Sequence, residues 1–342
     1  MKRYLVRRIL LAILVIYGVS VITFILSRVV PGDPVLMWVG HKARTDQIEQ
    51  ARKELGFDKP LVVQYLVYIK KLMQGDLGES LRSRQKVSGE LSRRYAATFE
   101  LVTVSMTLAL LIGIPIGVLS ASHKDSWIDH LSRFVSISGV AMPVFWLGMI
   151  LQILFHGQLH IFPLQARLGD DIVRSSPIAS TTGLYLIDSL ITWNLAGLES
   201  ALKHIALPAI TLSFASLAII TRMTRSCMLE VLSEDYVQTS RAFGVSNAVI
   251  NYKYALKNAL IPTTTVVGLS IGYLLGGSFL VESIFDWPGV GGYAVMSIMT
   301  NDFPAIMGVT ISFAATYVLV NFLVDMVYFL IDPRIKSPRY QD

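Results

Sequence analysis

Six long apolar runs alternate with polar segments along the chain. A helix that crosses a bilayer needs about 20 predominantly apolar residues, and each run is close to this length or longer. Helices satisfy their own backbone hydrogen bonds, so apolar runs of this kind cross membranes as helices. The pattern therefore predicts an all-α integral membrane protein with six transmembrane helices. The runs cover residues 9–30, 99–120, 132–155, 205–221, 261–281 and 305–331.

Basic residues beside two of the runs indicate the orientation of the chain. Four of them lie within residues 2–8, directly before the first run, and Arg222 and Arg225 follow the fourth. Lys and Arg favour the cytoplasmic side of short loops. The first run is longer than the apolar part of a signal peptide, and no small-x-small cleavage site precedes residues 31–34. We therefore expect an uncleaved signal anchor, with both chain ends in the cytoplasm.

The polar segments predict a division of the chain into parts. Residues 31–95 are polar and form an extracytoplasmic subdomain between the first two helices, while residues 156–203 form a second outside loop. The expected parts are residues 1–30 with the N-terminal end and helix 1, residues 31–95, residues 96–331 with helices 2–6 and a cytoplasmic coupling loop at residues 226–260, and a cytoplasmic tail at residues 332–342.

Three features inside or beside the runs suggest local structure. Pro143 is expected to bend the third helix. Glycines at four-residue spacing in the fifth run, such as Gly268 and Gly272, suit close helix packing and equally a helix that lines a pathway. His156 and His160 have the i, i+4 spacing of a metal pair, but two histidines without a supporting cluster favour an interfacial role over metal binding.

Residues 233–262, called the polar segment below, stand out between the fourth and fifth runs. Ser233 is a candidate N-cap of one short helix, Gly244 its stop and Ser246 the N-cap of a second helix. The small side chains near Gly244 would let a partner's surface approach the backbone closely. On the second helix the spacing predicts an apolar face of Val249, Tyr252, Leu256 and Leu260 and another face of Asn247, Asn251 and Asn258.

Composition agrees with a membrane protein and excludes several other classes. Hydrophobic residues make up 53% of the 342 residues, and the mean hydropathy is +0.55. The net charge of +6 comes from basic residues that flank apolar runs, which argues against nucleic-acid binding. The single cysteine, Cys227, excludes an internal disulfide and a zinc cluster. The chain has no Gly-x-x-x-x-Gly-Lys-Ser/Thr loop, so ATP use would come from another polypeptide and no cofactor is expected on this chain.

The polar segment resembles the EAA loop of binding-protein-dependent ABC importer permeases. Aligned on Gly244, the general pattern's acidic residue and two alanines fall at Gln238, Thr239 and Ser240, and its proline falls at Lys257. The next proline is Pro262. These departures resemble the peptide-importer branch, which differs from this chain at Gln238, Ser240 and Phe243.

Further motifs carry the same resemblance from Thr23 to Ile335. In the outer segments they include a turn that contains Trp287, which suits the membrane interface, and substrate contact there is possible. The matching stretches are residues 23–24 with 31–34, 55–60 with 64–65, 75–78 with Ser80, then Glu282, Phe285, Trp287, Pro288 and Gly289, and finally residues 321–328 and 332–335.

The resemblance implies a type I ABC importer permease fold in a prokaryotic inner membrane. It also implies a second homologous permease, two ABC ATPase subunits and an extracytoplasmic substrate-binding protein, with transport by alternating access. Peptides are the implied cargo, with nickel chelates, glutathione and oligosaccharides as alternatives within the same machinery. The residues expected to couple ATPase motion to the membrane helices are Asp235, Tyr236, Thr239, Arg241, Ala242, Gly244 and Asn258.

Two other classes compete with this interpretation. An ion-coupled secondary transporter needs charges within its membrane helices, and Asp325 in the sixth run is nearly the only candidate. Its position near the cytoplasmic end favours a structural ion pair or cap over proton coupling. An intramembrane hydrolase would need paired aspartates or a Ser/His pair within the runs, and the runs contain neither.

Overall fold

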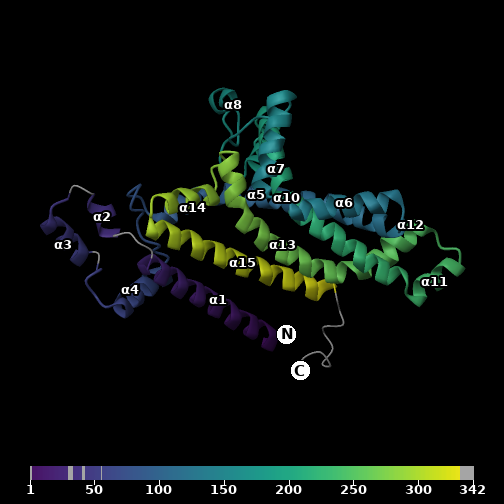
Figure 1. The fold of residues 1–342 in the computed structure, drawn as a ribbon, viewed down its shortest axis with the longest axis horizontal. Helices are drawn as coiled ribbons and strands as arrows, with labels where there is room; N and C mark the ends of the chain where they lie inside the picture. Colours follow the sequence, from purple (N-terminus) through teal and green to yellow (C-terminus); the bar gives the residue numbers. More distant parts are fainter. Residues whose placement is uncertain (1, 30–33, 41–42, 55, 332–342) are drawn as a thin grey trace. The chain divides into compact units, whose positions relative to one another are not determined.

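The computed structural model describes residues 2–29, 34–40, 43–54 and 56–331, and within these residues it contains helices and no β-sheet, apart from one isolated β-bridge (Figure 1). Five helices are long and apolar enough to cross a membrane, and a bent helix pair makes a sixth span. The predicted all-α architecture is therefore confirmed. The chain divides into two compact units. Unit 1 comprises residues 1–97 and 288–318, and unit 2 comprises residues 98–287 and 319–342.

Unit 1 combines the first long helix with a set of short ones. Exposed apolar side chains cover α1, including Leu10 and Leu14, as expected of a helix that faces lipid. Its core gathers Val87, Val290, Ala305 and their neighbours. The helices are α1 (Lys2–Val29), α2 (Pro34–Val39), α3 (Thr45–Glu54), α4 (Leu61–Met73), the start of α5 (Val87–Ser122), α14 (Val290–Met299) and α15 (Phe303–Ile331) up to residue 318.

Unit 2 is built around α10 (Leu195–Leu232), which packs against α13 (Leu256–Ile284) and α6 (Trp127–Ala141). Small residues allow α5 and α6 to approach α10 closely. A Cβ added at Gly117 would lie 2.7 Å from Thr224 Cβ, and one added at Gly139 would lie 2.8 Å from Ala218 Cβ. The remaining elements are α5 from residue 98, α7 (Val144–Leu151), the π-helix η1 (Gln152–Gln158), α8 (Asp170–Ser175), α9 (Tyr185–Ile191), α11 (Asp235–Ala242), α12 (Asn247–Val249), the π-helix η2 (Ile250–Ala255) and α15 from residue 319.

The third apolar run is a broken helix. Its two halves, α6 and α7 with η1, meet at 108° across Met142 and Pro143. The predicted bend at Pro143 is thus confirmed, and α7 visibly turns away from α6 (Figure 1). Pro143 has no backbone N–H and adopts an extended conformation, so it ends one helix and precedes the next.

Several helices extend beyond the apolar runs that predicted them. The second starts at Val87 instead of residue 99, and its charged first turns are helix-compatible because Arg93 and Arg94 each lie 3.2 Å from Glu90. The fourth covers α10 instead of residues 205–221, and the Asn194 side chain caps it by accepting from Gly197 N at 2.8 Å. Hydropathy identified the part that crosses lipid, while capping fixes the helix ends.

In the fifth run, Gly268 has a packing role. A Cβ there would lie 2.8 Å from Cγ1 of Val324 on α15, whereas a Cβ at Gly276 would meet nothing within 4 Å. The side chain of Asp325, residues 30–33 and the tail from residue 332 lie outside the described part of the chain, so the predictions made for them stay predictions.

Candidate functional site

The polar segment begins with α11, one residue later than expected. Ser233 does not cap α11; it is the C-cap of α10, and its hydroxyl donates to the Glu230 carbonyl at 2.6 Å. Its backbone still has helical angles, and the chain turns only at Glu234, which is extended. The predicted cap at Ser233 is therefore wrong, and the N-cap position belongs to Glu234, which makes no side-chain capping bond.

Gly244 ends α11 as predicted. Its φ of 75° lies in the left-handed region, which costs glycine little because glycine has no Cβ. The Gly244 N–H donates to the Arg241 carbonyl at 2.9 Å, and the Val245 N–H donates to the Ser240 carbonyl at 3.1 Å. These two bonds form a Schellman motif, which fixes the direction in which the chain leaves the helix.

The second helix of the polar segment is continuous with the fifth span. Ser246 caps it as predicted, accepting from Val249 N at 3.5 Å, and helical structure then runs from Asn247 to Ile284. A π-helical turn, η2, interrupts the α-helical spacing. The buried face is therefore formed by Ile250, Ala255 and Ala259, and the predicted apolar face is wrong: Tyr252 is half exposed.

Contacts within unit 2 hold the polar segment in place. Val237, a residue of α11, is fully buried. The Asn251 amide donates to the Ser122 hydroxyl at the end of α5, and the Asn258 amide donates to the Tyr236 hydroxyl, each at 2.8 Å. The second bond ties α11 to the start of α13. The segment is thus a positioned surface on the ends of long helices.

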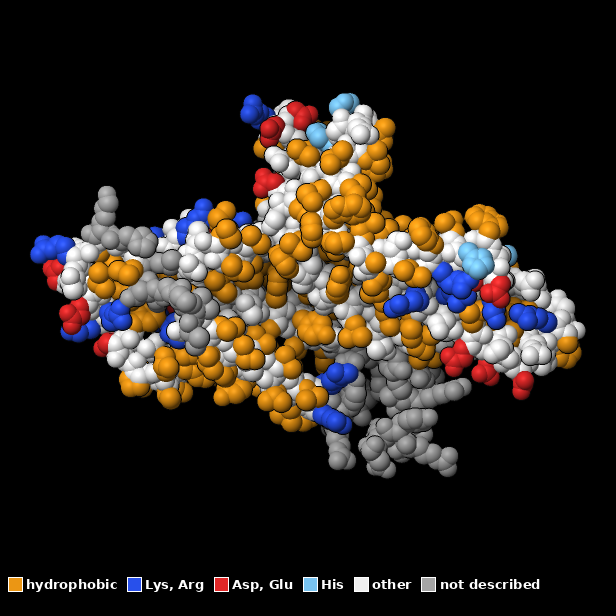
Figure 2. All heavy atoms as spheres, in the orientation of Figure 1, with side chains coloured by type: hydrophobic (Ala, Val, Ile, Leu, Met, Phe, Trp, Pro, Cys, Tyr) orange, Lys and Arg blue, Asp and Glu red, His pale blue; other side chains and the backbone are white. Residues whose placement is uncertain are grey.

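All seven residues predicted to contact an ATPase are exposed. Acidic and basic side chains gather over the region of α11, while hydrophobic side chains dominate the long helices on the same face (Figure 2). Among these charges, Phe243 is 83% exposed, and an exposed aromatic side chain of this kind is a common anchor of protein interfaces. The seven are Asp235, Tyr236, Thr239, Arg241, Ala242, Gly244 and Asn258.

A buried ion pair lies within the same unit and was not predicted. Asp129 on α6 is fully buried and accepts from Nε and a terminal nitrogen of Arg225 on α10, at 2.5 and 2.8 Å. The Ser120 hydroxyl on α5 donates to the same carboxylate at 2.6 Å. Three helices are thereby joined at one carboxylate. The sequence offered only the sidedness signal of Arg225, because the partners are 96 positions apart.

A second buried pair joins Glu100 to Arg167. Their charged atoms are 2.5 Å apart, and the Arg167 guanidinium lies 3.8 Å from the centre of the Tyr185 ring. Glu282, also buried, accepts from the Thr98 hydroxyl at 2.7 Å. Trp287 is only 3% exposed and therefore packs inside the protein, while its predicted place at the membrane interface stays a prediction. The motif around Trp287 thus has a packing role in unit 2.

Asp188 organises the loop before α9. Its buried carboxylate accepts from the backbone N–H groups of Thr181, Thr182 and Gly183 and from the Thr182 hydroxyl, at 2.7 to 3.2 Å. Burial acts to raise the pKa of Asp188, but these hydrogen bonds lower it by more, so the pKa lies below its ordinary value.

We expect Asp188→Asn to loosen this loop at neutral pH. In the wild-type protein the carboxylate's contribution is complete above the ordinary aspartate pKa of about 3.9 and is lost as the pH falls through the lowered pKa. At pH 7, hydrogen exchange of residues 176–192 should therefore be faster in the variant than in the wild type. The same loosening should appear in the wild type only in strong acid. Unchanged exchange in the variant would contradict this role.

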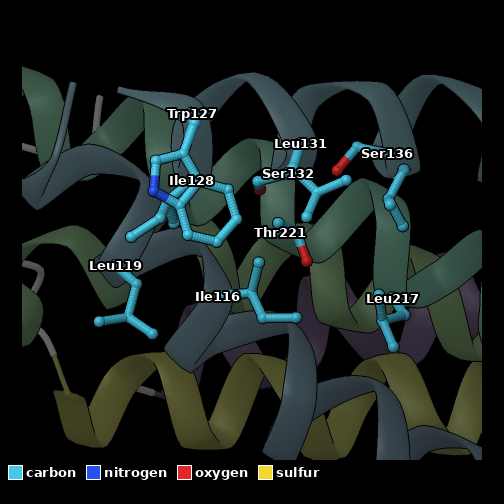
Figure 3. A pocket seen from close by; sticks show the side chains of 10 residues that line it. Ile116, Leu119, Trp127, Ile128, Leu131, Ser132, Ser136, Leu217 and Thr221 are labelled. Carbon is cyan, nitrogen blue, oxygen red and sulfur yellow. The ribbon is translucent and has the colours of Figure 1, made fainter. Parts of the chain in front are cut away.

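An apolar pocket of about 250 Å³ opens between α5, α6 and α10 (Figure 3). Leu119, Trp127 and Leu131 line it, and the buried Thr221 hydroxyl beside it has no hydrogen-bond partner in the described part of the chain. The pocket has no charged lining residue. It can accept an apolar group, but it has no chemistry for ion binding or catalysis.

The two histidines considered for metal binding lie in different local settings. His156 lies in η1 and its Nδ1 is 2.9 Å from the Phe162 carbonyl, while His160 follows the helix with a φ of 52°. Within the described ranges, no three His, Cys, Asp or Glu side chains are grouped so that they could hold a metal ion.

Comparison with known proteins decides the family. The sequence pattern of the binding-protein-dependent transport system inner membrane component matches residues 113–337, and the N-terminal pattern of that membrane component matches residues 1–102. The chain belongs to this family. It is accordingly a multi-pass inner-membrane permease and a transport component, in a system that depends on a binding protein.

Individual relatives resemble this permease over nearly its full length. The probable D,D-dipeptide transport system permease protein of Escherichia coli strain K12 is 47% identical over 94% of each chain. The dipeptide transport system permease protein of Alkalihalophilus pseudofirmus is 44% identical over 98% of this permease and 100% of its own length. The glutathione transport system permease protein of Pectobacterium atrosepticum is 36% identical over 98% and 99%.

Proposed function

We propose that this permease forms, with a second homologous permease, the membrane pathway of an ABC importer for short peptides. Two separate ATPase subunits would bind the polar segment from the cytoplasm, where both chain ends would also lie. An extracytoplasmic binding protein would deliver the peptide. The permease would need no cofactor of its own.

One observation carries the ATPase contact: the polar segment is exposed yet firmly held. All seven predicted contact residues are accessible, while Val237 and the hydrogen bonds of Asn251 and Asn258 fix the segment to the helices. A surface held in this way can pass motion of a bound partner to the membrane helices, as alternating access requires. The α10–α13 packing would carry that motion through unit 2.

The peptide cargo is supported by the relatives, several of which are named for dipeptide transport. A relative named for glutathione transport, itself a small peptide, supports glutathione as the second candidate. Nickel chelates and oligosaccharides have no such support among the relatives described above.

The proposal is tested by purifying the permease from its native membrane in mild detergent and identifying the proteins that accompany it. We expect a second permease and ATPase subunits, and ATP hydrolysis stimulated by a binding protein loaded with dipeptides but not by one loaded with glutathione. A permease that purified alone and moved solute in liposomes under an ion gradient would contradict the proposal.

A further inference from the structure

A pocket of about 360 Å³ lies within unit 1. Its walls come from the ends of α1 and α4, from α2 and from the turn before α4, and its floor comes from the first turns of α15. The volume is in the range of sites for small ligands. Unlike the apolar pocket of unit 2, this one combines charges of both signs with aromatic rings.

The floor of the pocket is fixed by Asp302. This buried carboxylate accepts from the Ser80 hydroxyl at 2.5 Å and from Leu81 N at 3.0 Å, which holds the turn of a short hairpin against the start of α15. Phe303 and Met307, both buried, continue the floor. The hairpin therefore presents its side chains from a preorganised base, which reduces the cost of ligand binding.

Besides Arg28, four charged side chains line the pocket, and these four have no ion pairs of their own among the residues that the structure describes. Lys71 comes from the end of α4, and Asp76 comes from the turn after it. Glu79 and Lys86 are opposite each other in an antiparallel β-bridge. Opposed residues of such a bridge project to the same face. All four are exposed, and none lies within 4.0 Å of an opposite charge in the described part of the chain.

Two aromatic rings provide an apolar wall. The Arg84 guanidinium lies over the Trp38 ring, 3.8 Å from the ring centre. The Arg28 guanidinium lies over the Phe57 ring, 4.5 Å from its centre. Arg28 is also held by Gln64, which accepts from its Nε at 3.0 Å. The rings are thus fixed by neighbouring cations, and they can pack against an apolar side chain of a ligand.

We propose that this pocket binds the two charged ends of a short peptide. Asp76 and Glu79 would accept from the ammonium group, Lys71 and Lys86 would donate to the carboxylate, and Trp38 and Phe57 would contact an apolar side chain. The inference rests on the proposed peptide transport and its topology, which places unit 1's short helices outside. A peptide released by the binding protein would be held here before it enters the membrane.

The test uses the complete importer in nanodiscs of phosphatidylglycerol and phosphatidylcholine, without its binding protein. The probe is radiolabelled L-alanyl-L-phenylalanine, compared with its N-acetyl and C-amide forms. We expect each blocked form to bind at least about tenfold more weakly, because each loses a charge-assisted contact. Transport of the same peptide with the binding protein present is measured in parallel and tests the proposed function separately.

Paired variants assign the ends of the peptide. Asp76→Asn with Glu79→Gln should weaken the free peptide about tenfold and leave the N-acetyl form unchanged. Lys71→Gln with Lys86→Gln should weaken the free peptide and leave the C-amide form unchanged. The control, Asp58→Asn with Lys59→Gln, changes the same kinds of exposed charge outside the pocket and should alter neither.

This crossed pattern cannot result from misfolding, which would weaken every form alike. Uniform loss in both double variants would overturn the inference, as would wild-type transport without measurable binding. Displacement of the peptide by added phosphatidylethanolamine, whose headgroup also carries both charges, would assign the pocket to lipid and overturn it too. Absence of peptide transport would contradict the proposed function instead. The binding data would then still show whether the pocket binds the peptide.

Discussion

Replacing Gly244 with tryptophan is expected to reduce transport to background while the permease stays folded and inserted. The site is open, since a Cβ at Gly244 would meet no atom of the chain within 4 Å, so the indole would project from the proposed docking surface. The left-handed φ of 75° costs a non-glycine residue about 1–2 kcal/mol, which a large helical protein can tolerate. Uptake of labelled dipeptide and co-purification of ATPase subunits would measure the effect.

Two variants separate docking from backbone strain. Gly244→Asn introduces a small side chain that tolerates the left-handed region, so it should retain most of the transport. Gly75→Trp places the same indole at another helix end with a φ of 75° and no neighbour within 4 Å. Because Gly75 adjoins the proposed peptide pocket, this variant is compared by insertion and thermal unfolding, not by uptake, and it reports the folding cost. Normal uptake by Gly244→Trp would show that this surface carries no ATPase contact.

Replacing Asp129 with asparagine is expected to destabilise the permease by about 3–5 kcal/mol. The change would leave Arg225, which is 18% exposed, without its anionic partner among three packed helices, and an uncompensated buried charge is costly. The asparagine oxygen can still accept from the Ser120 hydroxyl, so the loss falls on the pairing with Arg225. Thermal unfolding in detergent, followed by the accessibility of the buried Cys227 thiol, would report the loss.

The exposed pair Glu199–Lys203 serves as a control. Its charged atoms are 2.7 Å apart, yet the two side chains are 70% and 54% exposed. Glu199→Gln should therefore have little effect on stability, because solvent screens an exposed pair. Similar losses in both variants would mean that burial does not decide the contribution of Asp129.

The apolar runs predicted the spans because burial in lipid imposes a simple compositional requirement. They could not predict helix ends such as Val87, where Glu90 and Arg94 make a polar turn helical. Nor could they reveal η2, because a π-helical turn has no clear sequence signal and changes which side chains face inward. The predicted face through Tyr252 failed for that reason.

In the polar segment, the local chemistry of Gly244 and Ser246 was sufficient to predict the chain's turns. The cap at Ser233 failed because nothing local distinguishes it from Glu234. Long-range pairs were out of reach: the partners Asp129–Arg225 and Glu100–Arg167 are joined only when separate helices pack. Of these four residues only Arg225 stood out in the sequence, as a marker of orientation, and nothing there pointed to its partner.

The helical segment from Asn247 to Ile284 spans 38 residues, roughly 57 Å at about 1.5 Å per residue. It is longer than the hydrocarbon core of a bilayer, which measures about 30 Å. A force on its polar end would pass along one continuous helical segment, and the π-helical turn η2 and Pro262 are the places where that segment can bend. A pivot at Gly268, where Val324 lies close, would turn a small displacement at one end of the segment into an opposite one at the other.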